Sequence, residues 1–259
     1  MKLSCVTASY VADLINYPGE VDWGVAAHTI ETSPILETMD GIIKRLAPAK
    51  LDGIEPWFPH LGSKKNDAAL LAQIKAKFAA AGLVVPACAG DAGDPVHDPE
   101  NSERPFQIAR AMGAALIAAH ADPDAVAAIC KTCEKYQIAL GFENGGEGDV
   151  SEILAAINQG NPWVGANLDT GNFANSGGDP VKAVRLLGKR INHVHFKDVT
   201  LGGKGHCISL GHGIVDVRGV MRELKAIGYD GWLSIEIETV DHDPTAEIIE
   251  SANILRSLF

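Results

Sequence analysis

Positive charge is scarce in this sequence of 259 residues. Lysine and arginine together number 22, against 33 aspartates and glutamates, which gives a formal net charge of −11. Proteins whose main task is to hold nucleic-acid phosphates concentrate lysine and arginine, so this balance argues against that class. We therefore expect no nucleic-acid partner.

Long apolar runs are also missing. A membrane-spanning helix needs about 18 uninterrupted apolar residues, and the best candidate, residues 111–130, is interrupted by His120, Asp122 and Asp124. The N-terminal segment MKLSCVTASYV lacks the apolar region and cleavage site of a secretory signal. Five cysteines, an odd number, do not suggest a disulfide framework. These absences predict a cytoplasmic protein with no membrane partner.

Short apolar segments alternate with longer amphipathic ones along the chain. Helical patterns at 33–46 and 179–187 open on Ser-Pro and Asp-Pro, and the pattern at 67–81 ends at a glycine. The apolar segments are predicted as strands at 2–7, 51–57, 83–88, 115–120, 138–143, 164–169, 192–197 and 232–237.

A strand followed by a helix, repeated about eight times over about 250 residues, is what a closed (β/α)₈ barrel requires. The alternative is an open doubly wound sheet, which a GxGxxG turn after the first strand would favour. The segment ASYVADLINYPGE contains no such turn, and no linker, charge block or low-complexity stretch divides the chain. We predict an α/β fold, a single (β/α)₈ TIM barrel domain over residues 1–259.

Four successive predicted strands end in residue types that bind metal ions. These residues are Glu143, Asp169, His195 and Glu236. In a barrel the C-terminal strand ends converge on one mouth. Buried carboxylates without partners are costly, so three of them near one axis need a cation or shared protons. Any one of these residues alone is better explained as an exposed residue at the start of a loop, but the agreement of four strand ends predicts a shared divalent-metal site.

The segments ENGG, LDTGN, HVHFKD and GYDGWLSIE occur in this order at successive strand ends. In this respect the whole chain resembles the xylose-isomerase-like TIM barrel family of the sugar phosphate isomerase/epimerase superfamily. The resemblance implies that Glu143, Asp169, His195 and Glu236 bind one divalent cation. It also implies that Glu143 and Glu236 serve as catalytic acid and base.

Three carboxylates and one imidazole form an oxygen-rich donor set, which favours Mn²⁺ or Mg²⁺ and is also compatible with Co²⁺ or Zn²⁺. Such a cation can stabilise the enediolate formed when a sugar or polyol ketone loses the proton beside its carbonyl. We expect a metal-dependent isomerase or epimerase. The alternatives are a lyase or dehydratase acting on a keto-sugar, an inosose or a 3-keto-glycoside through the same site, and a binding module without activity.

Further residues near the predicted strand ends are candidates for contact with a small carbohydrate substrate. Glu55 and Trp57 share one face, where a carboxylate beside an aromatic plane suits a sugar ring, although Glu55 could equally anchor a salt bridge. His120 ends its strand, and Lys197 lies at the mouth, where it can also pair with a carboxylate. His193 is expected to be a hydrogen-bonded core residue. Self-association is left open, because the apolar tail ANILRSLF could cover the barrel base or a neighbouring molecule.

Overall fold

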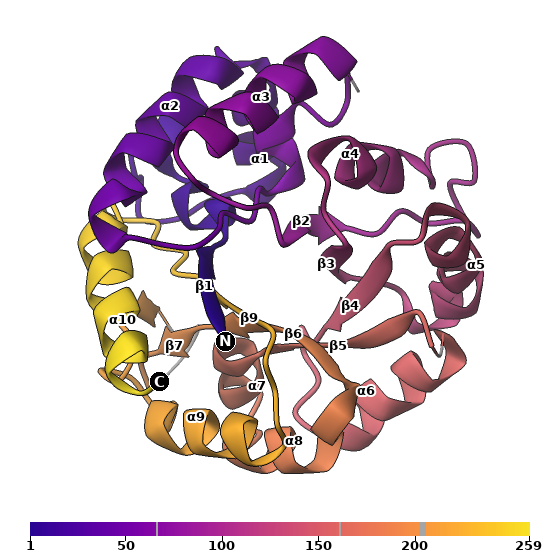
Figure 1. Ribbon diagram of the computed structural model, residues 1–259, viewed down its shortest axis with the longest axis vertical. Coiled ribbons are helices and arrows are strands. Elements are labelled where there is room, and N and C mark those ends of the chain that lie inside the picture. Colours follow the sequence, from indigo (N-terminus) through magenta and orange to yellow (C-terminus); the bar gives the residue numbers. More distant parts are fainter. Residues whose placement is uncertain (66, 161, 202–205) are drawn as a thin grey trace.

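The structure is a computed structural model that describes residues 1–65, 67–160, 162–201 and 206–259. In this part of the chain one parallel sheet curls around a central axis in the order β1-β9-β6-β5-β4-β3-β2, with helices outside it (Figure 1). Its strands are β1 (Lys2–Cys5), β2 (Ala87–Asp91), β3 (Leu116–His120), β4 (Ala139–Glu143), β5 (Val164–Asp169), β6 (Ile191–Phe196) and β9 (Trp232–Ile235). The predicted TIM barrel is therefore confirmed.

Residues 51–57 close the barrel between β1 and β2, but they do not form the continuous strand that the sequence predicted. They join their neighbours through isolated parallel bridges, Val6 with Glu55 and Trp57 with Ala89 among them. Pro56 supplies no N–H to a ladder, which accounts for the interruption. Pro86 has the same effect on the next strand, so β2 begins at Ala87 instead of residue 83.

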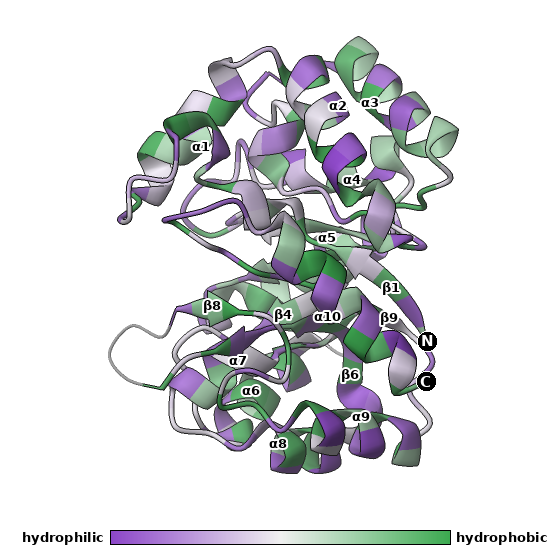
Figure 2. Ribbon diagram, turned by 90° about the vertical axis from the view of Figure 1, so that its left-hand side faces the viewer, coloured by the Kyte–Doolittle hydropathy of each residue, from purple (hydrophilic) through white to green (hydrophobic). Residues whose placement is uncertain are grey.

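The outer helices start close to where the capping signals place them. The Asp67 side chain accepts hydrogen bonds at the start of α3, and Asp179 does so at the start of α8. Figure 2 shows that these helices carry both hydrophobic and hydrophilic residues, as expected for elements packed on a sheet. The helices are α1 (Trp23–Thr32), α2 (Ile35–Leu46), α3 (Ala68–Ala80), α4 (Arg104–Met112), α5 (Val126–Tyr136), α6 (Val150–Ile157), α7 (Thr170–Asn175), α8 (Pro180–Leu187), α9 (Val217–Ala226) and α10 (Thr245–Ser257).

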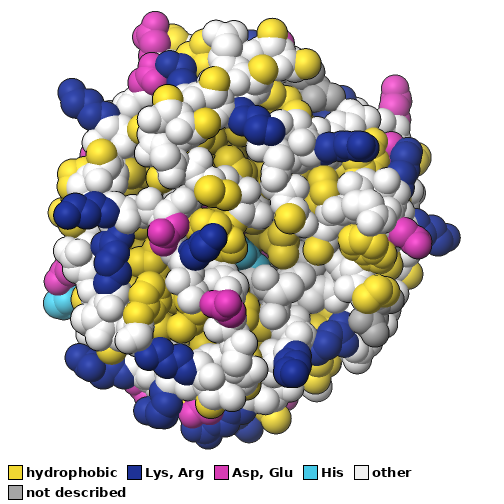
Figure 3. Space-filling model, viewed as in Figure 1, with side chains coloured by type: hydrophobic (Ala, Val, Ile, Leu, Met, Phe, Trp, Pro, Cys, Tyr) yellow, Lys and Arg dark blue, Asp and Glu magenta, His cyan; other side chains and the backbone are white. Residues whose placement is uncertain are grey.

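The apolar core lies mainly between the sheet and the helices, whereas the barrel interior is partly polar. Ser4, Glu55, His193 and Ser234 are all buried inside it. Both chain ends lie on the face in view in Figure 1, and Figure 3 shows lysines and arginines spaced around the rim of that face. The C-terminal strand ends point to the opposite face. None of the helices in the described ranges is long and apolar enough to cross a membrane.

Beyond β6 the chain forms a short antiparallel pair that the sequence did not predict, β7 (Asp198–Val199) with β8 (Cys207–Ile208). The fully buried Asp198 carboxylate organises the loop that follows. It accepts backbone hydrogen bonds at 2.9–3.0 Å from Val199, Gly211, Gly213 and Val215. A Cβ atom at Gly213 would lie 2.2 Å from Asp198 Oδ1, so the close approach of this loop requires glycine.

We expect Asp198→Ala to destabilise the fold by about 3 kcal/mol, because it leaves two buried and two partly buried N–H groups without their acceptor. Urea unfolding measures this change. The matched variant Asp124→Ala, at an exposed position, should change the free energy of unfolding by less than about 0.5 kcal/mol. Equal stability of the two variants would contradict the anchoring role of Asp198.

Candidate metal centre and active site

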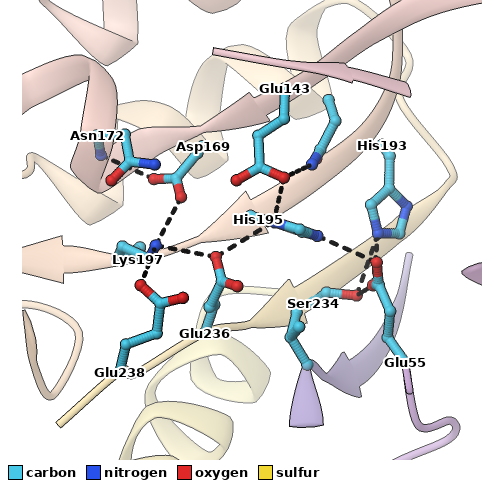
Figure 4. A network of polar contacts seen from close by, with 12 residues as sticks. Glu55, Glu143, Asp169, Asn172, His193, His195, Lys197, Ser234, Glu236 and Glu238 are labelled. Carbon is cyan, nitrogen blue, oxygen red and sulfur yellow. Dashed lines mark hydrogen bonds and ion pairs between the residues drawn. The ribbon is translucent and has the colours of Figure 1, made fainter. Parts of the chain in front are cut away.

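The four residues predicted as metal ligands lie together at the mouth of the barrel (Figure 4). Each offers one donor atom, and these atoms all lie within 4.8 Å of one another. His195 Nδ1 is 3.2 Å from Glu143 Oε2 and 3.2 Å from Glu236 Oε2. The sheet register pairs Asp169 directly with His195. Four neighbouring strands, β4, β5, β6 and β9, thus bring the cluster together.

Three of these donor atoms are buried and make no contact beyond ion pairs: Asp169 Oδ2 and Glu236 Oε2 with Lys197 Nζ, and His195 Nδ1 with the neighbouring carboxylates. Three buried carboxylates share one ammonium and one imidazole here, so the cluster keeps an excess of buried negative charge and of acceptor oxygens. A divalent cation fits this donor set, since it would satisfy all of them at once. The other nitrogen of His195 is already engaged, which leaves Nδ1 free for a ligand.

Residues of the ENGG and LDTGN segments hold Asp169 in place and make room for its neighbour Lys197. Asn144, of the ENGG segment, holds the Asp169 backbone with two hydrogen bonds of 3.0 Å, one in each direction. Asp169 Oδ1 caps α7 by accepting from the Asn172 amide at 2.8 Å, which leaves Oδ2 for the cluster. At Gly171 a Cβ atom would lie 2.6 Å from Lys197 Cγ, so the LDTGN glycine makes room for that lysine.

Lys197 lies inside the cluster, where the sequence had also allowed a substrate contact. Its side chain is only 3% exposed, and Nζ lies 2.9 Å from Asp169 Oδ2, 3.0 Å from Glu236 Oε2 and 2.9 Å from Glu238 Oε2. Burial alone would lower the pKa of Lys197, but the three carboxylates outweigh it and raise that pKa well above its ordinary value. Lys197 is therefore a permanent internal cation.

Sequence reasoning missed Glu238, which lines the same cavity. The signal was present, because Glu238 is two residues beyond Glu236 in extended chain and so points to the same side. Burial raises the pKa of Glu238 to about 7 and that of Asp169 to about 6, although Lys197 opposes both shifts. Burial also acts to raise the pKa of Glu236, but Lys197 and His195 outweigh it and keep that carboxylate ionised.

Glu55 does not reach the cavity, in contrast to the substrate contact expected from the sequence. The side chain has no exposed surface, and its carboxylate bridges His193 Nε2 at 2.8 Å and His195 Nε2 at 3.1 Å. Ser234 donates a further hydrogen bond to it. Glu55 is thus a buried salt-bridge anchor, which was the alternative to a substrate contact. His193 is a hydrogen-bonded core residue, as expected. The arrangement fixes the orientation of the His195 ring.

The cluster opens into a cavity of about 480 Å³ whose wall includes Trp57, His120 and Lys197. His120 Nδ1 lies 3.1 Å from the Glu143 carbonyl oxygen, and the ring is more than half exposed. Trp57, His120 and Lys197 thus line one cavity, and their contact with a substrate stays a prediction.

Fold and site together define a class: a parallel (β/α) barrel with a carboxylate–histidine cluster at the C-terminal ends of its strands. The chain belongs to the xylose isomerase-like TIM barrel family, whose family model matches residues 43–258. The resemblance drawn from the sequence motifs is confirmed.

Among curated proteins, an inosose dehydratase of Klebsiella pneumoniae is 36% identical over 42% of this chain and 41% of its own length. Matches to this and other curated relatives cover from 28% to 45% of the relatives' length. These partial matches show kinship without defining what the whole protein does.

Solved structures align over nearly the whole chain at low identity. The probable 3-DHS dehydratase AsbF of Bacillus anthracis has a TM-score of 0.74 at 16% identity, covering 99% of both chains. The IolI protein with a bound zinc atom has a TM-score of 0.73 at 16% identity, covering 99% of this chain and 96% of its own. An L-ribulose 3-epimerase has a TM-score of 0.73 at 18% identity, covering 99% and 94%. At such identities these structures support the fold alone.

Proposed function

We propose that this protein is a divalent-metal-dependent isomerase or epimerase of a small sugar or polyol ketone. The observation that carries the proposal is the buried cluster of Glu143, Asp169, His195 and Glu236, whose donor atoms lie within 4.8 Å of one another. Three of these atoms make no contact beyond ion pairs with Lys197 and within the cluster. The zinc atom named for the IolI structure and the epimerase among the structural neighbours are consistent with such a centre.

The four residues would hold the cation, which when bound supplies Lewis-acid polarisation of a substrate carbonyl. Glu143 and Glu236 come from β4 and from the end of β9, with two strands between them in the sheet. They therefore approach a substrate from two sides. Glu236 is held ionised by Lys197 and His195 and is suited to take the proton beside the carbonyl. Glu143, on the other side, is placed to return a proton.

Where the proton returns decides the outcome. Delivery to the opposite face of the same carbon inverts that centre, whereas delivery to the neighbouring carbon moves the carbonyl. His195 lies between the two glutamates, with Nδ1 3.2 Å from each, and the buried Glu55 fixes the His195 ring. The substrate is expected to be polyhydroxylated, because polar groups and the aromatic face of Trp57 line one cavity.

A dehydratase is the second candidate, and a specific observation favours it. Elimination needs a proton donor for the departing hydroxyl, and Glu238, whose pKa burial raises to about 7, lines the cavity and pairs with Lys197. Curated relatives named inosose dehydratase, at 30–36% identity over part of the chain, agree with this alternative.

Incubation with ketoses, inososes and 3-keto-glycosides in D₂O tests the proposal. We expect the Mn²⁺-loaded protein to place deuterium on the carbon beside the carbonyl and to leave the carbon skeleton and the product mass otherwise unchanged. NMR reads the position of the label, and mass spectrometry reads the product.

The outcomes separate the candidates. Loss of water would support the dehydratase over the isomerase. Absence of deuterium exchange across the panel, with metal bound, would contradict both. Metal-free protein is the control and should give no exchange.

A further inference from the structure

One face of α1 lines the same cavity as the metal cluster. Trp23, Ala27 and Glu31 recur every fourth residue, which places them on one side of the helix, and all three belong to the cavity wall. Glu143 and Glu236 belong to that wall as well. The cavity therefore extends from the proposed acid and base, Glu143 and Glu236, to the face of α1 that carries Trp23, Ala27 and Glu31. The proposed proton-transfer and metal-binding roles do not involve these three residues.

Glu31 is an unusual residue for such a wall. It is 5% exposed, and its carboxylate accepts a hydrogen bond from Ser63 Oγ at 2.7 Å through Oε1. Oε2 is buried and accepts no hydrogen bond, and its one partner in the described structure is the Lys64 ammonium 2.9 Å away. The Lys64 side chain is 67% exposed, so its ion pair with Glu31 is open to solvent. A buried carboxylate oxygen with spare acceptor capacity on a cavity wall suits a ligand hydroxyl.

Two tryptophans line the same cavity as this carboxylate. Trp57 lies at the barrel rim, and the Trp23 ring meets it edge-on with centroids 5.6 Å apart. Trp23 stays 42% exposed although it packs on another aromatic ring. Aromatic faces bind the C–H face of a sugar ring, while a carboxylate binds its hydroxyls. The cavity wall outside the metal cluster thus combines the two kinds of group that bind sugar rings.

We infer that the substrate carries a second sugar ring, and that Trp23 and Glu31 bind this ring while the keto-sugar reacts at the metal. This inference rests on the proposed function, because it assigns the metal end of the cavity to the reacting ring. The substrate class is therefore a keto-glycoside in preference to a free keto-monosaccharide.

Paired ligands test the inference. Each keto-sugar, with glucose or galactose configuration, is titrated into Mn²⁺-loaded protein with and without a second glucose ring, and binding is followed by tryptophan fluorescence. We expect the second ring to tighten binding about tenfold or more in the wild type. That gain should disappear in Glu31→Gln, because a hydrogen bond to a charged acceptor typically contributes at least this factor. Binding of the single-ring ligands should be unchanged.

Two further variants complete the experiment. Trp23→Ala, at a partly exposed position, should also lose the gain from the second ring. Glu37→Gln, the same substitution on an exposed position of α2, should keep it. If the second ring adds no affinity in any pair, the inference is overturned. Failure of deuterium exchange with every ligand overturns the proposed function instead, and the two failures are read independently.

Discussion

Glu143→Gln and Glu236→Gln are each expected to lower turnover and deuterium exchange by about a thousandfold, the scale of a lost general acid or base. Glutamine keeps the size of the side chain but cannot accept the proton. Each residue is also a proposed metal ligand, so metal affinity should fall as well, which isothermal titration with Mn²⁺ measures. Steady-state assays on the best substrate of the panel give the rates.

A matched control is available on α5. Glu134→Gln makes the same substitution at an exposed position and should leave turnover within about twofold of wild type. Circular dichroism establishes that the site variants are folded. Full activity in either site variant, at saturating metal, would exclude the assigned proton-transfer role of that glutamate.

Lys197→Met is expected to destabilise the metal-free protein by about 3–5 kcal/mol, because it leaves buried carboxylates without their cation. Asp169, Glu236 and Glu238 all face Lys197 Nζ at 2.9–3.0 Å. Added Mn²⁺ would supply the missing positive charge. We therefore expect the metal to raise the melting temperature more in this variant than in the wild type.

Thermal unfolding with EDTA and with Mn²⁺ measures both effects. The control Lys131→Met, at an exposed position on α5, should change neither value noticeably. If Lys197→Met responded to metal no more than the wild type does, Lys197 and the proposed cation would not share the same carboxylates.

The barrel and the clustering of its four strand-end residues were predictable because both follow from local pattern. Apolar strands that end in Glu143, Asp169, His195 and Glu236 must bring those side chains to one mouth once the strands are parallel neighbours. The register that pairs Asp169 with His195 then follows from the pleat. Helix starts such as the one at Asp67 were also predictable from the sequence, because a helix cap is a local interaction.

Partners across the barrel were not predictable from local pattern. Glu55 was assigned to substrate, yet it reaches His193 and His195, which lie about 140 positions away in the chain. Lys197 was expected at the mouth, where it could also pair with a carboxylate, but one of its three carboxylate partners is Glu238, which sequence reasoning missed. Glu31 gave no signal, because its burial depends on how α1 lies over the cavity. The strand expected at 51–57 was wrong because Pro56 outweighed the apolar pattern.

The interrupted edge at 51–57 has a consequence for how the mouth can adapt. The other neighbouring strands are joined by ladders of paired residues, with one register shift between β5 and β6 at Ala166 and Asn167. The edge at 51–57 instead depends on scattered backbone bonds such as Glu55 N to Cys5 O. The free-energy cost of separating two neighbouring strands is therefore lowest at this edge. Trp57 lies on this edge, next to Trp23 of α1. The mouth of the barrel can therefore widen beside the proposed subsite for the second ring, while the pairing of β5 with β6, which holds Asp169 and His195, is kept.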